Sequence, residues 1–279
     1  VRSITSHTVY PKELLNDSLV SDVYKDLKIN IIHYYKNSLK VLKWATDYSY
    51  SQLRKPNKRG DWKKYSRSTV THGTYNIQDN VIELPAGIFE KPIFSRNRPR
   101  YLNFGSIGSH IGHEIAHAFS YKGRLFDIDG NKRNWFDRAD ENALINRTQC
   151  FVEQYNNYTA GSEIQIQVNG VKTLEENIAD ITGLKASYQA YQTWVKHHGR
   201  EPKLPGLKYT PNQLFWISSA NMFCARMDPS TLEDIMSADK HSPHEFRIIG
   251  PLSNLPEFAK DFNCKPDSAM VRKNRCEFW

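Results

Sequence analysis

The stretch His113-Glu114-Ile115-Ala116-His117 is the most informative part of this sequence, because it places two histidines four residues apart. Residues i and i+4 lie on one face of an α-helix, so both rings can reach a single metal ion. Glu114 stands about 60 degrees around the helix from His117. Its carboxylate can therefore take a proton from a water on that ion without binding the ion itself. The motif predicts a helix that carries half of a zinc site.

The flanking residues predict that this helix spans residues 105–121, with Gly123 placed to end it. An apolar stripe at helical spacing supports the helix: Ile107, Ile111, Ile115, Ala118 and Phe119. We expect the stripe to be buried and the two histidines to face a cleft. The chain has further histidines at His72 and His110, which we interpret as ordinary polar positions and not as ligands.

A catalytic zinc ion takes three protein ligands and a water, so a carboxylate has to come from another segment. Glu176 and Asp180 share one face of a long helix predicted for Leu174–His198. Glu176 can bind the metal, and Asp180 can accept the other ring N–H of a ligand histidine. However, Thr173-Leu174-Glu175-Glu176 also fits a capping box, in which Glu176 bonds back to the cap. The segment alone leaves both possibilities open, and the first motif favours zinc binding.

The remaining elements predicted from the sequence are short, and no internal repeat is present. Helical spacing of apolar residues runs through residues 14–53, and the polar stretch at residues 55–60 is the best candidate for a domain boundary. Strands are predicted at residues 81–84 and 164–168, the second followed by a hairpin signal at Asn169-Gly170. Another helix is predicted at residues 213–227.

The composition is that of a globular protein, with 279 residues, 39% hydrophobic and 24% charged. The net charge is +8, but the basic residues are scattered apart from one cluster at residues 54–64. Without a nucleic-acid-binding motif, we expect no nucleic-acid partner. No apolar run is long enough to cross a bilayer, and the chain starts at Val1 with no signal segment, so we expect any signal or membrane anchor to lie upstream.

Cysteines and glycosylation sequons indicate the compartment. None of the cysteines forms a CxxC pair, so a cysteine zinc site is not indicated: Cys150, Cys224, Cys264 and Cys276. Sequons for N-glycosylation begin at Asn16, Asn146 and Asn157. Together with the even number of cysteines, they favour an oxidising setting. We expect an extracellular protein, either secreted or the ectodomain of a single-pass membrane protein.

Taken in order, these motifs resemble the neprilysin and endothelin-converting-enzyme family of zinc peptidases, over nearly the whole chain. The stretches that carry the resemblance are Leu84-Pro85-Ala86-Gly87-Ile88, residues 107–117, residues 173–180, Leu204-Pro205-Gly206-Leu207, His241-Ser242-Pro243, residues 246–250 and Cys276-Glu277-Phe278-Trp279. The resemblance implies an α+β, predominantly helical fold of the thermolysin-like zincin type, with one zinc ion per chain.

The resemblance also implies roles for single residues. His113, His117 and Glu176 would bind zinc, Glu114 would be the general base, and Asp180 would support a ligand histidine. His241, oriented by Asp239, would steady the tetrahedral intermediate, and Arg247 would hold a substrate carbonyl. Cys150 would pair with Cys276. Cys224 and Cys264 resemble cysteines whose partners lie near the family's N-terminus, so here they are either free or paired with each other.

The positions that would contact substrate partly depart from the family pattern. The family's substrate-anchoring Asn-Ala-Tyr-Tyr aligns with His72-Gly73-Thr74-Tyr75, so His72 replaces the anchoring asparagine and leaves the main chain of Gly73 and Thr74 to bind an extended peptide. Pocket positions that are usually apolar are Ser109 and His110 here. Other pocket positions stay apolar and predict a hydrophobic residue after the cut bond: Ile88, Ile93, Met222 and Phe223.

The resemblance divides the chain into residues 1–55, the tail of a second helical domain that would roof the site, and residues 56–279, the catalytic domain. It predicts a zinc metalloendopeptidase that cuts oligopeptides on the amino side of hydrophobic residues. The alternative is an inactive, zinc-containing peptide-binding or scaffold protein of the same fold, suggested by the altered residues 72–75 and the missing roof. The intact Glu114 argues against that alternative, because a purely structural metal site does not need this carboxylate.

Overall fold

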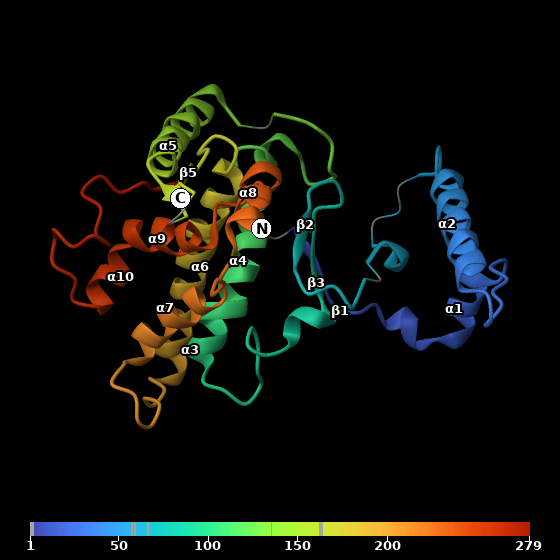
Figure 1. The fold of residues 1–279 in the computed structure, drawn as a ribbon, viewed down its shortest axis with the longest axis horizontal. Helices are drawn as coiled ribbons and strands as arrows, with labels where there is room; N and C mark the ends of the chain where they lie inside the picture. Colours follow the sequence, from blue (N-terminus) through green and yellow to red (C-terminus); the bar gives the residue numbers. More distant parts are fainter. Residues whose placement is uncertain (1–2, 57, 59, 66, 135, 162–163) are drawn as a thin grey trace.

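Two long helices, α4 and α6, lie side by side at the centre of the chain and carry the residues of interest (Figure 1). The computed structural model describes residues 3–56, 58, 60–65, 67–134, 136–161 and 164–279. Most of the chain is helical, with one small sheet beside the helices. This agrees with the predominantly helical α+β fold that was predicted.

The sheet has three strands in the order β1-β3-β2. β1 (Thr5–Val9) runs parallel to β3 (Val81–Pro85), and β2 (Thr74–Asn76) pairs antiparallel with β3 on its other side. The central strand is confirmed at the place predicted for residues 81–84, and it is buried because its apolar side chains fill the core. β2 is left as an edge strand, with one row of main-chain groups not paired within the sheet.

The contact between α4 (Ser109–His117) and α6 (Leu174–His198) is a close approach of two backbones. A Cβ atom on Gly183 would lie 2.2 Å from the backbone nitrogen of His113, and one on Gly112 would lie 2.5 Å from the carbonyl oxygen of Gly183. Only glycine leaves room for such a crossing. The two glycines therefore set the distance between the two halves of the predicted metal site.

The other helices pack around this pair. α3 (Arg100–Asn103) and a π-helical turn (Phe104–Gly108) lead directly into α4. The remaining helices are α5 (Arg138–Asn156), α7 (Pro211–Asn221), α8 (Pro229–Ala238), α9 (His244–Asn254) and α10 (Pro256–Asp261). Large side chains from them form one core with α6, the most buried being Phe151, Tyr155, Ile178, Tyr191, Phe215 and Trp216.

Short elements complete the chain. They are the 3-10 helices Lys12–Leu15, Trp62–Tyr65, Ala86–Phe89 and Gly123–Leu125, and a two-stranded ribbon of β4 (Thr159–Ala160) and β5 (Ile166–Gln167). Cys150 in α5 is bonded to Cys276, which is the pairing that the family resemblance implied. Cys224 and Cys264 are both free, so they are not paired with each other.

Several predicted boundaries were wrong. α4 ends at His117 and not at residue 121, and its C-cap is Ala118, so Gly123 lies beyond the end of the helix. Most of the predicted apolar stripe is only half-buried, because α4 turns Gly112, His113 and Ala116 towards α6 instead. The predicted hairpin at Asn169-Gly170 does not form, since β5 pairs backwards with β4.

Two predicted helices were also placed inaccurately. Residues 14–53 form two helices, α1 (Asp17–Tyr24) and α2 (Tyr34–Ser51), with a break between them. The helix predicted at residues 213–227 is α7, which starts two residues earlier because Thr210 forms a capping box with Gln213, and it ends at Asn221. The helix predicted for Leu174–His198 is confirmed over its full length.

The first helices lie apart from the main body, beyond the sheet (Figure 1). Neither α1 nor α2 contains a buried residue, and their surroundings expose large apolar side chains such as Ile31, which is 95% exposed, and Tyr34, which is 87% exposed. Asn57 and Arg59, which belong to the predicted boundary, lie outside the described residues. Among the described helices none is both long and apolar enough to cross a membrane.

The glycine contact predicts whether the substitution Gly183→Ala raises or lowers the stability of the protein. Helix propensity alone predicts that Gly183→Ala stabilises α6 by about 1 kcal/mol. The contact with the His113 backbone predicts the opposite, a loss of about 1–3 kcal/mol from overpacking. Urea unfolding of the variant measures the difference. Ala190→Gly, on an exposed turn of the same helix, is the control for propensity. A Gly183→Ala protein as stable as the wild type would contradict this packing.

Candidate metal centre and cleft

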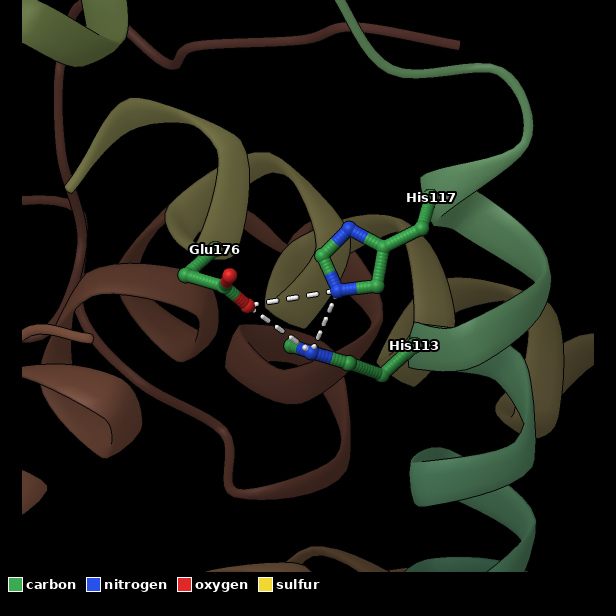
Figure 2. A group of neighbouring side chains, drawn as sticks. All are labelled: His113, His117 and Glu176. Atoms are coloured by element: carbon green, nitrogen blue, oxygen red, sulfur yellow. Dashed lines mark hydrogen bonds and ion pairs between the residues drawn. The ribbon is translucent and has the colours of Figure 1, made fainter. Parts of the chain in front are cut away.

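Three side chains from the two central helices converge on one point. His113 and His117 project from α4, and Glu176 reaches them from the first turn of α6 (Figure 2). The Nε2 atoms of the two histidines lie 3.0 Å apart, and each lies 3.2 Å from Oε2 of Glu176. His113 and Glu176 are buried. The convergence follows from the i, i+4 spacing on α4 and the close crossing with α6.

This donor set fits a metal ion. Oε2 of Glu176 is buried and has no hydrogen-bond partner among the described residues. The separations of 3.0–3.2 Å match those between neighbouring ligands of a tetrahedral ion with bonds of about 2 Å. A buried carboxylate oxygen without a hydrogen bond is costly unless a cation compensates its charge. His113, His117 and Glu176 therefore form a group that can hold a metal ion. Among the described residues, it is the one group of histidine, cysteine or acidic side chains that lie close enough to share an ion.

The capping role that the sequence left open for Glu176 is not used. Thr173 makes no side-chain hydrogen bond as the cap of α6, so no capping box forms. The neighbouring Glu175 instead accepts hydrogen bonds from the hydroxyl of Ser120 and the backbone N–H of Lys122. Glu175 thus fastens the loop after α4 to α6, and Glu176 is left to face the histidines. This role of Glu175 was not predicted from the sequence, where its position next to Glu176 is the one available signal.

Asp180 lies one turn after Glu176 and supports His113 from behind. Oδ1 of Asp180 is 2.7 Å from Nδ1 of His113 and accepts a hydrogen bond from Nη2 of Arg247, also at 2.7 Å. Oδ2 of Asp180 accepts a second bond from Nε of Arg247, at 2.8 Å. Burial raises the pKa of Asp180, but the Arg247 charge and these hydrogen bonds outweigh it and hold the pKa well below its usual value. Asp180 is therefore a carboxylate that fixes the tautomer and the orientation of His113.

The surroundings of His113 favour positive charge. Burial alone lowers the pKa of His113, but the hydrogen bond to Asp180 and the nearby Glu176 and Glu114 raise it to about 9. The same carboxylates would favour a cation bound to this ring, because a metal replaces a proton at Nε2. Glu114 is buried on α4 between the two histidines in sequence and borders the same cleft.

His241 completes the polar wall opposite α4. Its Nδ1 is 2.7 Å from Oδ1 of Asp239, and its Nε2 is 3.2 Å from Oε2 of Glu176. Burial lowers the pKa of His241, but Glu176 and Asp239 outweigh it and raise the pKa above its usual value. Sequence features alone would have marked His241 and Arg247 as surface residues, whereas both are partly buried beside the metal group.

The metal group opens into a cleft that gathers the remaining predicted residues. Its walls include the edge strand with His72, Gly73, Thr74 and Tyr75, and the apolar side chains of Ile88, Ile93, Met222 and Phe223. Arg247 borders it as well, and its guanidinium lies 4.6 Å from the centre of the Phe223 ring. Ser109 lines a smaller adjoining pocket, and His110 lies in the wall of both. Burial lowers the pKa of His110 to about 4, so its ring is neutral near pH 7.

The predicted glycosylation sites lie on the surface. Asn16, Asn146 and Asn157 are all exposed. Asn16 caps α1 by accepting hydrogen bonds from the N–H groups of Ser18 and Leu19. Asn157 follows the last residue of α5 and donates to the carbonyl oxygen of Glu153.

Comparison with known proteins agrees with this geometry. The family model described as Peptidase family M13 matches residues 73–278. Neprilysin-2 of Drosophila melanogaster is 40% identical over 279 residues, which are 100% of this chain and 36% of that protein. Endothelin-converting enzyme 1 of Homo sapiens is 40% identical over 270 residues, 97% of this chain and 34% of that protein. The chain thus spans little more than a third of these relatives.

Solved structures give the same result. Mycobacterium tuberculosis zinc metalloprotease ZMP1 in complex with an inhibitor has a TM-score of 0.87 at 28% identity, covering 99% of this chain and 41% of that chain. A Haemonchus galactose-containing glycoprotein complex has a TM-score of 0.84 at 32% identity, covering 100% and 43%. The fold is thus that of a zincin-like metallopeptidase. The chain belongs to peptidase family M13.

Metal binding at the group has a direct test. Zinc should raise the melting temperature of the protein, since a ligand at about 100 times its dissociation constant adds about 2.7 kcal/mol of stability. His117→Ala should remove most of that rise, because it deletes one of the converging nitrogens. His197→Ala, which removes an exposed histidine of α6, should keep it. If zinc raised the melting temperature of both variants equally, the metal would have to bind at another group of residues.

Proposed function

We propose that the protein containing this chain is a zinc-dependent endopeptidase that binds one zinc ion per chain through His113, His117 and Glu176. The observation that carries the proposal is the convergence of these three side chains beside Glu114 on the floor of a cleft. Family membership supports it, because the matched model is one of peptidases. Structural metal sites are closed by four protein ligands, whereas three ligands facing a cleft leave a position for water.

The chemistry divides between the bound ion and the side chains of the chain. A zinc ion held by His113, His117 and Glu176 would lower the pKa of a bound water to about 7 and polarise a carbonyl group. Glu114 accepts the proton of the attacking water and passes it to the nitrogen of the leaving amine. Its burial next to the ligand histidines keeps it within the cleft and close to the reacting atoms. Asp180 holds His113 in the orientation needed throughout the reaction.

Two cationic side chains stabilise the negative charge that develops on the carbonyl oxygen. His241 keeps its Nδ1 on Asp239, which leaves Nε2 directed towards the metal group as a donor. Arg247 is fixed by its two bonds to Asp180 and borders the cleft, where it can hold a substrate carbonyl. Preorganised donors of this kind contribute several kcal/mol, because they need no reorientation during the reaction.

The cleft also suggests the substrate. Ile88, Ile93, Met222 and Phe223 offer an apolar surface, which favours peptides with a hydrophobic residue after the cut bond. The edge strand β2 borders the same cleft and can align an extended peptide through main-chain bonds. The proposed substrates are therefore oligopeptides that bind in an extended form.

The first 55 residues fit the tail of a second domain, with residues 56–279 forming the catalytic domain. The apolar side chains exposed on α1 and α2 support this division, because such surfaces are usually covered by another part of a protein. The remainder of that domain would roof the cleft. We also propose an extracellular location, supported by the Cys150–Cys276 disulfide and the three exposed sequons.

Glu114→Gln tests the mechanism. Removing the general base should lower kcat for a quenched fluorescent peptide by about 100- to 10,000-fold. Zinc content should remain that of the wild type, because Glu114 is not a ligand. Chelation should abolish wild-type turnover and added zinc should restore it. Full activity of Glu114→Gln would refute the mechanism, and stoichiometric zinc with no turnover of any peptide by the wild type would favour the scaffold alternative.

Asp239→Asn tests the part played by His241. Asp239 raises the pKa of His241, so replacing this carboxylate with a neutral amide should lower that pKa. Nε2 of His241 can donate a hydrogen bond only while the ring is protonated. The alkaline limb of the kcat profile should therefore move to lower pH in the variant. The rate below that limb should change little. An alkaline limb at the same pH in both proteins would exclude His241 as the titrating donor.

A further inference from the structure

One contact at the cleft joins the two segments in which this chain departs from the family pattern. The backbone N–H of Gly73 donates a hydrogen bond to Nε2 of His110, at a distance of 3.1 Å. Gly73 directly precedes the edge strand β2, and His110 lies on α4 one turn before His113. Both residues border the cleft.

The contact leaves little room for a side chain at position 73. A Cβ atom there would lie 2.9 Å from Nε2 and 3.2 Å from Cδ2 of His110, which is tighter than ordinary packing allows. The backbone of Gly73 has no positive φ angle that would demand glycine. A residue larger than glycine at position 73 would therefore make the imidazole at position 110 shift.

The bond also fixes the hydrogen-bonding state of the ring. An imidazole nitrogen that accepts a hydrogen bond carries no proton, so the proton of the neutral ring lies on Nδ1. Nε2 of His110 is 3.6 Å from a carboxylate oxygen of Glu114, and since that nitrogen carries no proton, the two do not form a charged pair. The ring of His110 thus serves Gly73 and does not take part in the metal group.

The contact removes a donor from the peptide-binding edge. Extended peptides bind to an open strand edge through its free N–H and C=O groups. Gly73 N–H points towards His110 on α4, and both residues border the cleft. A substrate that uses this N–H has to displace the imidazole, and one that does not use it binds with one main-chain bond fewer.

We propose that His110 is a positioning residue that holds the N–H of Gly73 and thereby weakens the binding of extended peptides at the edge strand. The inference rests on the peptidase function proposed above. His110→Val frees the donor, so KM for a peptide substrate should fall by about 2- to 10-fold, the effect of one neutral hydrogen bond. The effect should appear in KM, because the freed donor adds one main-chain bond to the bound peptide.

His110→Gln is the matched control. The end of a glutamine side chain can place an acceptor oxygen near the position of Nε2, so this variant should retain the bond to Gly73 and lack the fall in KM. If His110 merely fastened the strand to α4, His110→Val would lower the melting temperature and raise KM. That result, or an unchanged KM, would overturn the proposal.

Amide exchange at Gly73 tests the contact without relying on turnover. The Gly73 amide should exchange slowly in the wild type, faster in His110→Val, and slowly again when an excess of substrate peptide is bound to His110→Val carrying Glu114→Gln. Failure of the peptidase proposal would appear as no hydrolysis by the wild type, with this exchange pattern unaffected in the free proteins. Equal exchange in the free wild type and free His110→Val would show that the bond to His110 does not exist.

Discussion

The close crossing of α4 and α6 is the constraint on which the rest of the site depends. Gly112 and Gly183 let the two backbones touch, and a side chain at either position would separate the helices. The histidines come from one helix and the glutamate from the other, so the width of this crossing sets the distance between Nε2 of His113 and Oε2 of Glu176. A crossing wide enough to separate two of the donors by more than about 4 Å would leave no point within about 2 Å of both.

Around this crossing, charges are arranged in layers. Glu176 faces the histidines, Asp180 holds the back of His113, and Arg247 in turn balances Asp180. Each buried carboxylate thus lies next to an arginine or to a histidine, which offsets the cost of burying its charge. The same chain of contacts connects α9, which carries Arg247, to the metal group. Loss of any one member would leave a buried charge without compensation.

The sequence predicted the fold class and the grouping of His113, His117 and Glu176, but it did not predict the bounds of several helices. The H-E-x-x-H spacing and the face shared by Glu176 and Asp180 follow from helical geometry, and both segments were found. His241 and Arg247 were assigned by family resemblance alone, since nothing local distinguishes them from surface residues. α5, α8, α9 and α10 were not predicted. The buried face of α5 mixes polar with apolar residues, as with Leu144, Thr148 and Phe151, and neither α8 nor α10 contains a buried residue. The contact between Gly73 and His110 joins segments 37 residues apart, so sequence spacing could not reveal it.

A crystal structure of the zinc-loaded protein tests the central claim most directly. The account predicts one strong anomalous peak at the zinc edge, within about 2.0–2.2 Å of Nε2 of His113, Nε2 of His117 and a carboxylate oxygen of Glu176. It also predicts that Nδ1 of His113 remains bonded to Asp180. A peak at any other group of side chains, or a zinc ion bound by the histidines with the Glu176 carboxylate turned away, would contradict the account.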